Sequence, residues 1–308
     1  MVTLRELSAI EDGFVAGHGL CPGCAIPVIL RILLRATNDP VIVSNATGCL
    51  EVCSSMFPLN SWRIPWIHSA FENTAATAAG LESMYRALVR RGKISGNKNI
   101  KFLAIGGDGG TYDIGFQALS GAMERGHKIL YVCYDNQIYA NTGGQRSSAT
   151  PLGASATTSP AGTASYGKVQ WRKDLTKIIA AHNVAYAAQG APSRWQDLYN
   201  KAKKAFEADG PSFLNVLTAC PTEWKTDPDQ SIRLTQLAVD TCFWPLWEYD
   251  NGKYRITYFP KDKKPVSEWL KVQGRFKHLF LEENRYVLEE IQKRVDEEWE
   301  RLNKLVSP

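Results

Sequence analysis

Membrane and export signals are absent from the sequence. It has no apolar run approaching the roughly 18–20 residues that a transmembrane helix needs. Its first residues, MVTLRELSAIEDGF, show no basic segment followed by an apolar stretch, so no secretory signal is visible. We therefore expect a cytoplasmic protein without a membrane partner. At 308 residues, the chain is long enough for one large α/β domain or two smaller ones.

Features of a nucleic-acid-binding protein are also missing. The net charge is +5, but the lysines and arginines are dispersed, and no array of basic and aromatic residues occurs. We expect a solvated basic surface and no nucleic-acid partner. Such a surface favours an acidic partner protein by electrostatic steering.

The cysteines argue against a disulfide framework. Seven is an odd number, and disulfides are rare in the cytosol, so these thiols indicate metal binding or reactivity. They occupy positions Cys21, Cys24, Cys49, Cys53, Cys133, Cys220 and Cys242. We expect Cys133, in the middle of an apolar segment, and Cys242 to be core residues. The sequence leaves the role of Cys53 open.

A strand–helix–strand unit between residues 99 and 145 organises the chain. Residues 101–105 (KFLAI) are apolar and typical of a buried strand, and glycines follow directly. Residues 112–124 have helical spacing, and residues 128–134 (KILYVCY) predict a second buried strand. The turn after the first strand of such a unit lies where open parallel sheets bind ligands. Four residues are expected on the buried face of the helix: Ile114, Ala118, Leu119 and Met123.

The turn between this strand and helix has the composition of a diphosphate site. Gly107, Gly109 and Gly110 surround the carboxylate of Asp108, and glycine lets the main chain approach a phosphate closely. No lysine of a G-K-S/T motif follows, so a metal has to balance the phosphate charge. Asn136, at the end of the neighbouring strand, offers a second oxygen. Asp108 and Asn136 therefore predict a Mg²⁺ site that bridges protein and phosphate oxygens.

Four cysteines are expected near this turn. Cys21 and Cys24 form a C-x-x-C pair before a predicted helix, a spacing used for zinc, an iron–sulfur cluster or a redox disulfide. Cys49 and Cys220 each follow a predicted strand, at residues 41–45 and 212–217, and these strand ends share one edge of a parallel sheet. Four thiolates suit zinc and a 4Fe–4S cluster equally by ligand count. One C-x-x-C with two scattered ligands favours a cluster buried beside a cofactor.

The remaining segments predict an α/β fold, with a mostly parallel sheet, helices on both faces and a C-terminal extension. Helices are expected at residues 25–35, 72–91, 174–181 and 193–208, and a short strand at 184–186. Residues 58–68 are either a packed loop or a lining of the cofactor cleft. Residues 143–167 are either a flexible linker or a lid or docking segment.

We place one cofactor-binding domain at residues 1–225 and an extension, packing on this domain and on partner subunits, at residues 226–308. The extension is expected to contain a helix at 227–240, a hairpin at 244–258 and helices at 264–280 and 282–305. The last helix is either a solvated amphipathic helix or a clasp on another subunit.

These motifs together resemble the thiamine-diphosphate-binding β subunit of 2-oxoacid:ferredoxin oxidoreductases, the pyruvate:ferredoxin oxidoreductase group. The spacing of Gly-Asp-Gly and an Asn 28 residues after the Asp is itself similar to the pattern of thiamine diphosphate enzymes. The match continues through H-G-x-C-x-G-C at 18–24, A-T-G-C at 46–49, P-W-I-H-x-A-F-E-N at 65–73, G-D-G-G-T-Y-D-I-G at 107–115, Y-D-N-x-x-Y-x-N-T-G-G-Q at 134–145, P-S-F-L-N-V-x-x-x-C-P at 211–221 and V-x-x-W-L-K-x-Q-G-R-F at 266–276.

The resemblance implies cofactors and their residues. Mg²⁺ on thiamine diphosphate is held by Asp108, Asn136 and the main-chain carbonyl of Ile138. Phosphate contacts come from the turn at Gly107, with the N–H groups of Gly109 and Gly110. Asn141 lies near the thiazolium and substrate and is the implied catalytic residue. One 4Fe–4S cluster lies close to the cofactor, with Cys49 between the two, and its ligands are Cys21, Cys24, Cys49 and Cys220.

The resemblance also implies the reaction and the partners. A 2-oxoacid is oxidatively decarboxylated on thiamine diphosphate, electrons leave singly through the cluster to ferredoxin, and in the pyruvate enzymes coenzyme A takes the acyl group. The glutamate that activates the aminopyrimidine is expected on an α-type subunit, since this sequence shows no pyrimidine-binding domain. The implied partners are that subunit, γ- and δ-type subunits, and ferredoxin.

The resemblance does not determine which substrate this chain's enzyme uses, because members of the family act on different substrates. The segments GDGGTYDIG and YANTGGQRSS favour pyruvate. An oxalate-oxidising member, which needs no coenzyme A, is one alternative. A non-redox thiamine diphosphate decarboxylase subunit, whose cysteines hold zinc or nothing, is the second. A basic binding protein that carries a Gly-Asp-Gly turn by chance is the third.

Overall fold

The computed structural model describes residues 2–306 and contains one large mixed sheet. Its strand order is β10-β9-β7-β8-β4-β3-β1-β2, and all neighbours from β7 to β2 are parallel. Within this sheet only β9 runs against the other strands, because it pairs antiparallel with β7 on one side and with the edge strand β10 on the other. The expected α/β architecture with a mostly parallel sheet is thereby confirmed. The strands are β1 (Val41–Ala46), β2 (Trp66–Ser69), β3 (Lys101–Gly107), β4 (Leu130–Asp135), β7 (Tyr186–Gly190), β8 (Ser212–Leu217), β9 (Trp247–Asp250) and β10 (Lys253–Ile256).

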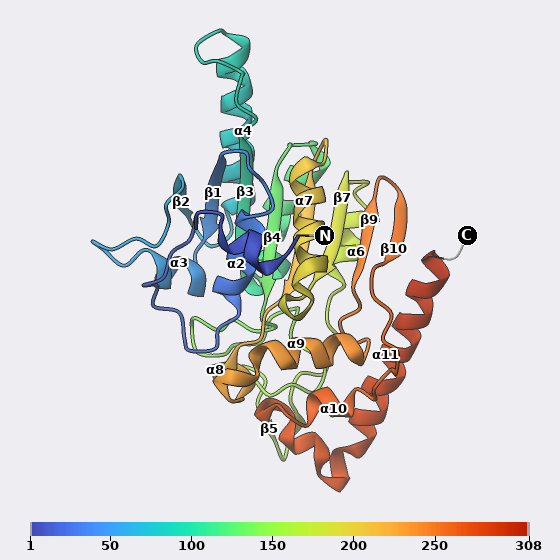
Figure 1. Cartoon of the computed structure of the whole chain (residues 1–308). Helices are drawn as coiled ribbons and strands as arrows, with labels where there is room; N and C mark the ends of the chain where they lie inside the picture. The colour runs from blue at the N-terminus through green and yellow to red at the C-terminus, as the bar shows by residue number, and fades with distance from the viewer. Residues whose placement is uncertain (1, 307–308) are drawn as a thin grey trace.

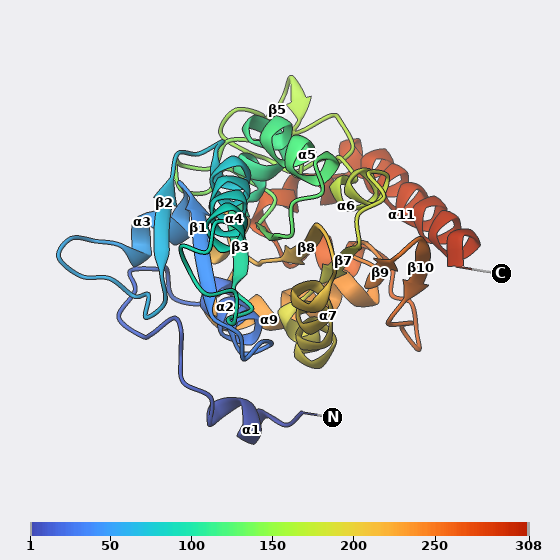
Figure 2. The same ribbon diagram turned by 90° about the horizontal axis from the view of Figure 1, so that it is seen from above.

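Helices cover both faces of the sheet, as Figures 1 and 2 show. One face is packed by α2 (Ile26–Leu34) and α7 (Trp195–Glu207), whose apolar residues join those of the central strands in one core. The opposite face is covered by α4 (Thr74–Arg90), α5 (Phe116–Glu124), α6 (Leu175–Ala180) and the end of α11 (Arg285–Val306). Strands β4 and β8 are buried along their whole length, which explains their continuous apolar sequences.

A third core lies at the lower end of the sheet in Figure 1 and belongs largely to the C-terminal extension. Its large side chains are Trp224, Trp244 and Trp269. The expected hairpin is confirmed, and its strands extend the main sheet. The division of the chain near residue 225 stays a prediction. The remaining helices are α1 (Leu4–Ser8), α3 (Cys49–Ser54), α8 (Pro221–Trp224), α9 (Ser231–Asp240) and α10 (Ser267–Leu270). There are also the short strand pair β5 (Ala161–Gly162) and β6 (Ser165–Tyr166), and the 3₁₀ helices η2 (Pro192–Arg194), η3 (Pro228–Gln230), η4 (Gly274–Phe280) and η5 (Glu282–Asn284).

The helix expected at residues 112–124 differs from the prediction. The chain first forms a π-helical segment, η1 (Gly109–Ile114), and α5 begins only at Phe116. The Gly115 N–H bonds to the Gly110 carbonyl at 2.9 Å, a wider turn that changes the phase of the side chains. Ile114 is therefore 55% exposed, and its expected place on the buried face is wrong, whereas Leu119 and Met123 are buried as expected.

Three other segments depart from expectation. Residues 264–280 do not form one helix, because α10 ends at Leu270 and the chain is extended at Gln273 before η4. The strand expected at 184–186 begins at Tyr186 and continues to Gly190. Within residues 58–68, Trp66 begins the four-residue edge strand β2, which was not predicted from the sequence.

The first half of the loop at residues 143–167 is packed, whereas most residues from 157 to 164 are exposed. Ser147, Thr150, Leu152 and Ala154 are all buried, so the flexible-linker interpretation is wrong for this half of the loop. The ammonium group of Lys168 anchors it by donating to the carbonyl oxygens of Ser147, Ser148 and Thr150. Within residues 2–306, no helix is both long and apolar enough to cross a bilayer.

Candidate cofactor-binding site

The carboxyl ends of the parallel strands create one pocket. Strands β1, β3 and β4 are neighbours and run in the same direction, so the segments that follow them meet at a single edge. The pocket contains all eight residues that the sequence assigned to thiamine diphosphate, its metal or the catalytic step. They are Cys49, Gly107, Asp108, Gly109, Gly110, Asn136, Ile138 and Asn141. Phe71, Tyr134 and Tyr139 supply aromatic walls; all three belong to the matched motifs, but the sequence assigned them no role.

The glycine turn allows the main chain to form the floor of this pocket. A Cβ atom at Gly109 would lie 2.5 Å from Cε1 of Tyr139, closer than real Cβ atoms approach carbon. The Tyr139 hydroxyl in turn donates to Asp113 Oδ2 at 3.0 Å, which fixes the ring over the turn. Glycine is therefore required here by close approach.

We expect Gly109→Ala to displace Tyr139 and narrow the pocket. The overpacking should cost about 1–3 kcal/mol of stability and lower the affinity for thiamine diphosphate with Mg²⁺ by at least about tenfold. Chemical unfolding and cofactor titration measure the two effects.

Gly80→Ala is the matched control, because Gly80 lies within α4 and a Cβ there has nothing within 4 Å. This variant should keep its cofactor affinity and gain about 0.5–1 kcal/mol of stability from helix propensity. Equal cofactor affinity in the Gly109 variant and the wild type would contradict the assignment of this turn.

Three oxygen-bearing groups converge at the end of β3 and β4. The Asn136 amide lies 2.7 Å from Asp108 Oδ1 and 2.6 Å from the Ile138 carbonyl oxygen when its nitrogen faces them as a donor. With the amide turned over, three oxygen atoms face one another and repel unless a cation lies between them. The donor set of one carboxylate, one amide oxygen and one carbonyl fits Mg²⁺.

The left-handed conformation of one residue makes this convergence possible. Gln137, between the two groups, has φ 65°, a conformation that is uncommon for a residue with a side chain. It turns the chain so that the Asn136 side chain and the Ile138 carbonyl face the same point. Such local strain persists only where surrounding contacts enforce it.

Asp108 is completely enclosed. It is 1% exposed, and it accepts hydrogen bonds from the Ser147 hydroxyl at 2.5 Å and the Asn136 N–H at 3.3 Å. Burial raises the pKa of Asp108 well above its usual value, and the nearby carboxylate of Asp135 raises it further. A bound divalent cation would favour the ionised form, so the site is electrostatically suited to a metal.

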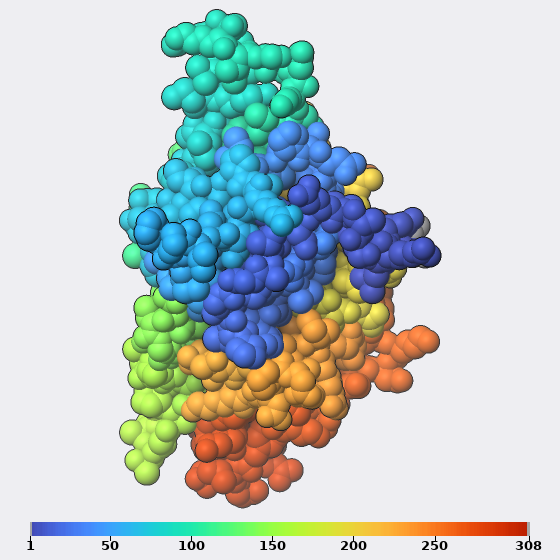
Figure 3. All heavy atoms as spheres, turned by 60° about the vertical axis from the view of Figure 1, so that its left-hand side comes forward, coloured from blue at the N-terminus to red at the C-terminus, as the bar shows by residue number. Residues whose placement is uncertain are grey.

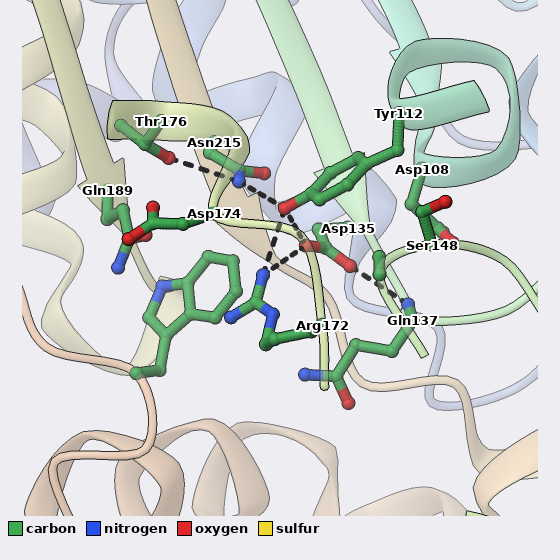
Figure 4. A network of polar contacts seen from close by, with 12 residues as sticks. Asp108, Tyr112, Asp135, Gln137, Ser148, Arg172, Asp174, Thr176, Gln189 and Asn215 are labelled. Atoms are coloured by element: carbon green, nitrogen blue, oxygen red, sulfur yellow. Dashed lines mark hydrogen bonds and ion pairs between the residues drawn. The ribbon is translucent and has the colours of Figure 1, made fainter. Parts of the chain in front are cut away.

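A buried polar network supports the end of β4 (Figure 4). Asp135 accepts hydrogen bonds from the Tyr112 hydroxyl at 2.6 Å and from Arg172 at 3.0 Å. Asn215, on β8, donates to the same Tyr112 hydroxyl at 2.6 Å. The Arg172 guanidinium also stacks 4.4 Å from the Trp244 ring. The network joins β4, β8, η1 and the residues before α6, so it holds the strand end that presents the metal-binding groups.

The four cysteines selected from the sequence lie at the same edge of the fold. Cys49 begins α3 directly after β1, and Cys220 precedes α8 after β8. The C-x-x-C turn is closed by a hydrogen bond from the Cys24 N–H to the Cys21 carbonyl at 3.0 Å. Its Gly23, at φ 76°, lies directly against the main chain of Pro228, in the segment that follows Cys220. Figure 3 shows the blue N-terminal segment in contact with this orange segment.

The thiols influence one another electrostatically. Burial raises the pKa of Cys24 and of Cys49 to about 12, and for both thiols the neighbouring Cys220 raises the pKa further. Burial also raises the pKa of Cys220 to about 11. Main-chain N–H groups oppose this rise, from Ile26 at Cys24 and from Glu223 at Cys220. These N–H groups are suited to stabilise thiolate ligands at the starts of α2 and α8.

No group of three or more His, Cys, Asp or Glu side chains in residues 2–306 could hold a single metal ion. The predicted Mg²⁺ ligands include only one such side chain, Asp108, so this statement does not test the predicted Mg²⁺ site. The four cysteines lie around the carboxyl edge of the sheet and do not converge on a site for a single metal ion. Cys133 and Cys242 are buried core residues, as expected, whereas Cys53 is half-buried one helical turn after Cys49.

Sequence motifs missed the residues that come from distant segments. Ser147 lies in a loop whose composition resembled a linker, and Arg172 belongs to no recognisable motif. Both are placed by tertiary structure, 39 residues after Asp108 for Ser147 and 37 residues after Asp135 for Arg172. No local sequence pattern predicts such contacts.

Comparisons with known proteins agree with this geometry. The family model described as thiamine pyrophosphate enzyme, C-terminal TPP binding domain, matches residues 46–216. A pyruvate synthase subunit PorB of Methanocaldococcus jannaschii is 51% identical over 288 residues, covering 93% of this chain and 95% of that protein. A ketoisovalerate oxidoreductase subunit VorB of Pyrococcus abyssi is 42% identical over 307 residues, covering 99% and 96%. A solved structure of a 2-oxoglutarate:ferredoxin oxidoreductase from Magnetococcus marinus has a similar fold, with a TM-score of 0.54, 20% identity and coverage of 75% of this chain and 80% of that one.

Proposed function

Because the chain belongs to the family of thiamine-diphosphate-binding β subunits of 2-oxoacid:ferredoxin oxidoreductases, we propose that it serves a pyruvate-type enzyme in the cytoplasm. The enzyme is an assembly with α-, γ- and δ-type subunits that passes electrons to ferredoxin. The observation that carries the proposal is the single pocket at the strand ends, which contains Asp108, Asn136, Ile138 and Asn141 together.

Each group in the pocket has a defined task. Asp108, the Asn136 side chain and the Ile138 carbonyl would hold Mg²⁺ at the diphosphate site. The N–H groups of Gly109 and Gly110 contact phosphate oxygens at the start of η1. Asn141 lies at the mouth of the pocket, exposed, where its amide can hydrogen-bond a substrate carbonyl or carboxylate.

The bound cofactors supply the chemistry that side chains lack. When bound, thiamine diphosphate would supply an electron sink for decarboxylation, and a 4Fe–4S cluster would supply one-electron transfer. Cys21, Cys24, Cys49 and Cys220 are the proposed cluster ligands. Cys24, Cys49 and Cys220 are half-buried and Cys21 is exposed. The N–H donors beside Cys24 and Cys220 support a sulfur-ligated group at this position. Cys49 also lines the thiamine pocket, so as a cluster ligand it would contact both cofactor sites.

The isolated chain should be inactive, because the glutamate that activates the aminopyrimidine is expected on the α-type subunit. We expect the purified chain to release carbon dioxide from pyruvate at least about a thousandfold more slowly than the assembled enzyme, since general acid–base catalysis alone contributes about 10²–10⁴-fold. Adding the α-type subunit should restore the rate. An isolated chain as fast as the complex would overturn this assignment.

The substrate is tested with the complete assembly. Pyruvate with coenzyme A should reduce ferredoxin faster than the branched-chain substrate 2-oxoisovalerate does. The latter is the alternative that the VorB relative suggests. Faster reduction with oxalate, without coenzyme A, would instead identify an oxalate-oxidising enzyme.

A further inference from the structure

Arg275 is the most deeply buried arginine near the proposed cofactor sites, although it comes from the C-terminal extension. It belongs to the Q-G-R-F segment, to which the proposed function gives no role. The side chain lies in η4 and is 1% exposed. Its Nε donates to Gln273 Oε1 at 2.9 Å, which orients the guanidinium plane inward.

One contact of Arg275 reaches the metal-binding segment. Its Nη2 donates to Gln137 Oε1 at 2.6 Å, and Gln137 is the fully buried residue with left-handed backbone between Asn136 and Ile138. A backbone of this kind is strained and needs support from surrounding contacts. The Arg275–Gln137 hydrogen bond provides that support from a segment 138 residues away.

The second contact of Arg275 reaches α8, the helix that directly follows Cys220. The guanidinium carbon lies 4.2 Å from the centre of the Trp224 ring, in the geometry of a cation–π interaction. Trp224 belongs to α8, and its N–H bonds to the Cys220 carbonyl at 2.9 Å. The Trp224 indole also donates to the Asn136 carbonyl at 2.8 Å, so Trp224 joins the two proposed sites.

The charge of Arg275 is not neutralised by a direct ion pair. Its Nη1 is buried and has no hydrogen-bond partner in residues 2–306. The ionisable groups that act on its charge are Cys220, Asp135 and Asp108. Burial lowers the pKa of Arg275 to about 9, and these three groups oppose the fall. The guanidinium therefore stays charged at neutral pH. A buried cation without a local carboxylate is costly, unless a negatively charged group binds nearby.

We propose that Arg275 is a positioning residue with two functions: it holds the Asn136–Ile138 segment in its metal-binding conformation, and it places a fixed positive charge beside the Cys220 ligand of the cluster. The inference rests on the proposed function, since it requires a cluster at Cys220. A fixed positive charge stabilises the reduced, more negative state of an iron–sulfur cluster and so raises its reduction potential. One side chain then sets properties of both cofactors.

Two variants, tested in the complete assembly, distinguish the effect of the Arg275 charge from the effect of its hydrogen-bond geometry. Arg275→Gln removes the charge and should lower the midpoint potential, measured by redox titration with electron paramagnetic resonance. We expect at least a tenfold fall in the reduced-to-oxidised ratio at a fixed potential, which corresponds to about 59 mV for one electron. Arg275→Lys keeps the charge but lacks the planar fork, so it should weaken Mg²⁺–thiamine diphosphate binding by about tenfold with a much smaller change in potential.

Gln137→Ala provides an independent test, because it removes the partner of Arg275 while the arginine stays. It should weaken cofactor binding and leave the potential unchanged. Arg194→Met is the matched control, since Arg194 also stacks on an aromatic ring, 3.8 Å from the centre of Tyr258, but contacts neither site. It should change neither measurement.

The outcomes distinguish this inference from the proposed function. Wild-type protein without iron and sulfide would refute the cluster itself. A loaded Arg275→Gln variant with the wild-type potential would overturn the proposed charge, and unchanged cofactor affinity in both Arg275 variants would overturn the positioning role. Cluster loss from both variants, with the fold intact by circular dichroism, would show structural support alone and would also overturn the charge coupling.

Discussion

Asp108→Asn is expected to lower the affinity for Mg²⁺–thiamine diphosphate by at least about 100-fold, which is about 2.7 kcal/mol of binding free energy. Asp108 is the only acidic side chain among the three proposed ligands. The variant would leave Mg²⁺ with neutral protein oxygens alone, and a hard cation in a buried site depends on carboxylate charge. Isothermal titration with Mg²⁺ and thiamine diphosphate, each with the other in excess, measures the loss.

The same variant should not lose stability when the cofactor is absent. Burial and the neighbouring Asp135 raise the pKa of Asp108, so ionisation of this carboxyl opposes folding at neutral pH. An amide of the same shape removes that cost, since it carries no charge. The melting temperature of the cofactor-free variant is therefore expected to equal or exceed that of the wild type.

Glu248→Gln is the matched control, because Glu248 is a buried carboxylate far from the pocket. It is 2% exposed, accepts a hydrogen bond from the Tyr186 hydroxyl and pairs with Lys204 and Arg255. Loss of its charge should cost about 1–3 kcal/mol of stability and leave cofactor affinity unchanged. Asp108→Asn should therefore lower cofactor affinity without loss of stability, whereas Glu248→Gln should lower stability without loss of cofactor affinity. An Asp108 variant that binds the cofactor within about threefold of the wild type would show that the metal lies elsewhere.

The architecture and the centre of the site follow from sequence for a physical reason. Buried parallel strands have continuous apolar sequences, and parallel strands bring their carboxyl ends to one edge. The segments that follow β1, β3 and β4 are therefore predictable neighbours, and the sequence alone places Asp108 and Asn136 together. Asp108 and Asn136 are 28 residues apart in one strand–helix–strand unit, and they lie close together in space.

Contacts between distant segments could not be predicted in this way. Ser147 reaches Asp108 from a loop of small polar residues, and Arg275 reaches Gln137 from the C-terminal extension. The error at Ile114 has another origin, since a 3.6-residue period was assumed where the chain forms a π-helical turn. The glycines that allow close approach to a diphosphate also permit that wider turn, so the departure from helical spacing occurs at the site itself.

Cys220→Ser is expected to abolish the iron–sulfur cluster and leave the thiamine site intact. Protein purified without oxygen should contain about four irons and four acid-labile sulfides per chain, and the variant should contain less than one iron. Serine keeps the size of the side chain but is a poor ligand for iron, so the fold should survive. Cofactor titration should give the wild-type affinity, because Cys220 does not line the thiamine pocket.

Two other cysteines provide controls of increasing stringency. Cys242→Ala removes a buried core thiol outside the proposed ligand set and should retain full iron. Cys53→Ala is the more stringent control, because Cys53 lies one turn after Cys49 on α3 and interacts electrostatically with Cys21. If iron is lost in the Cys53 variant and kept in the Cys220 variant, the ligand set is wrong although a cluster exists. If wild-type protein contains zinc or no metal, electron transfer through this chain is refuted, and the pocket belongs to a non-redox thiamine diphosphate decarboxylase.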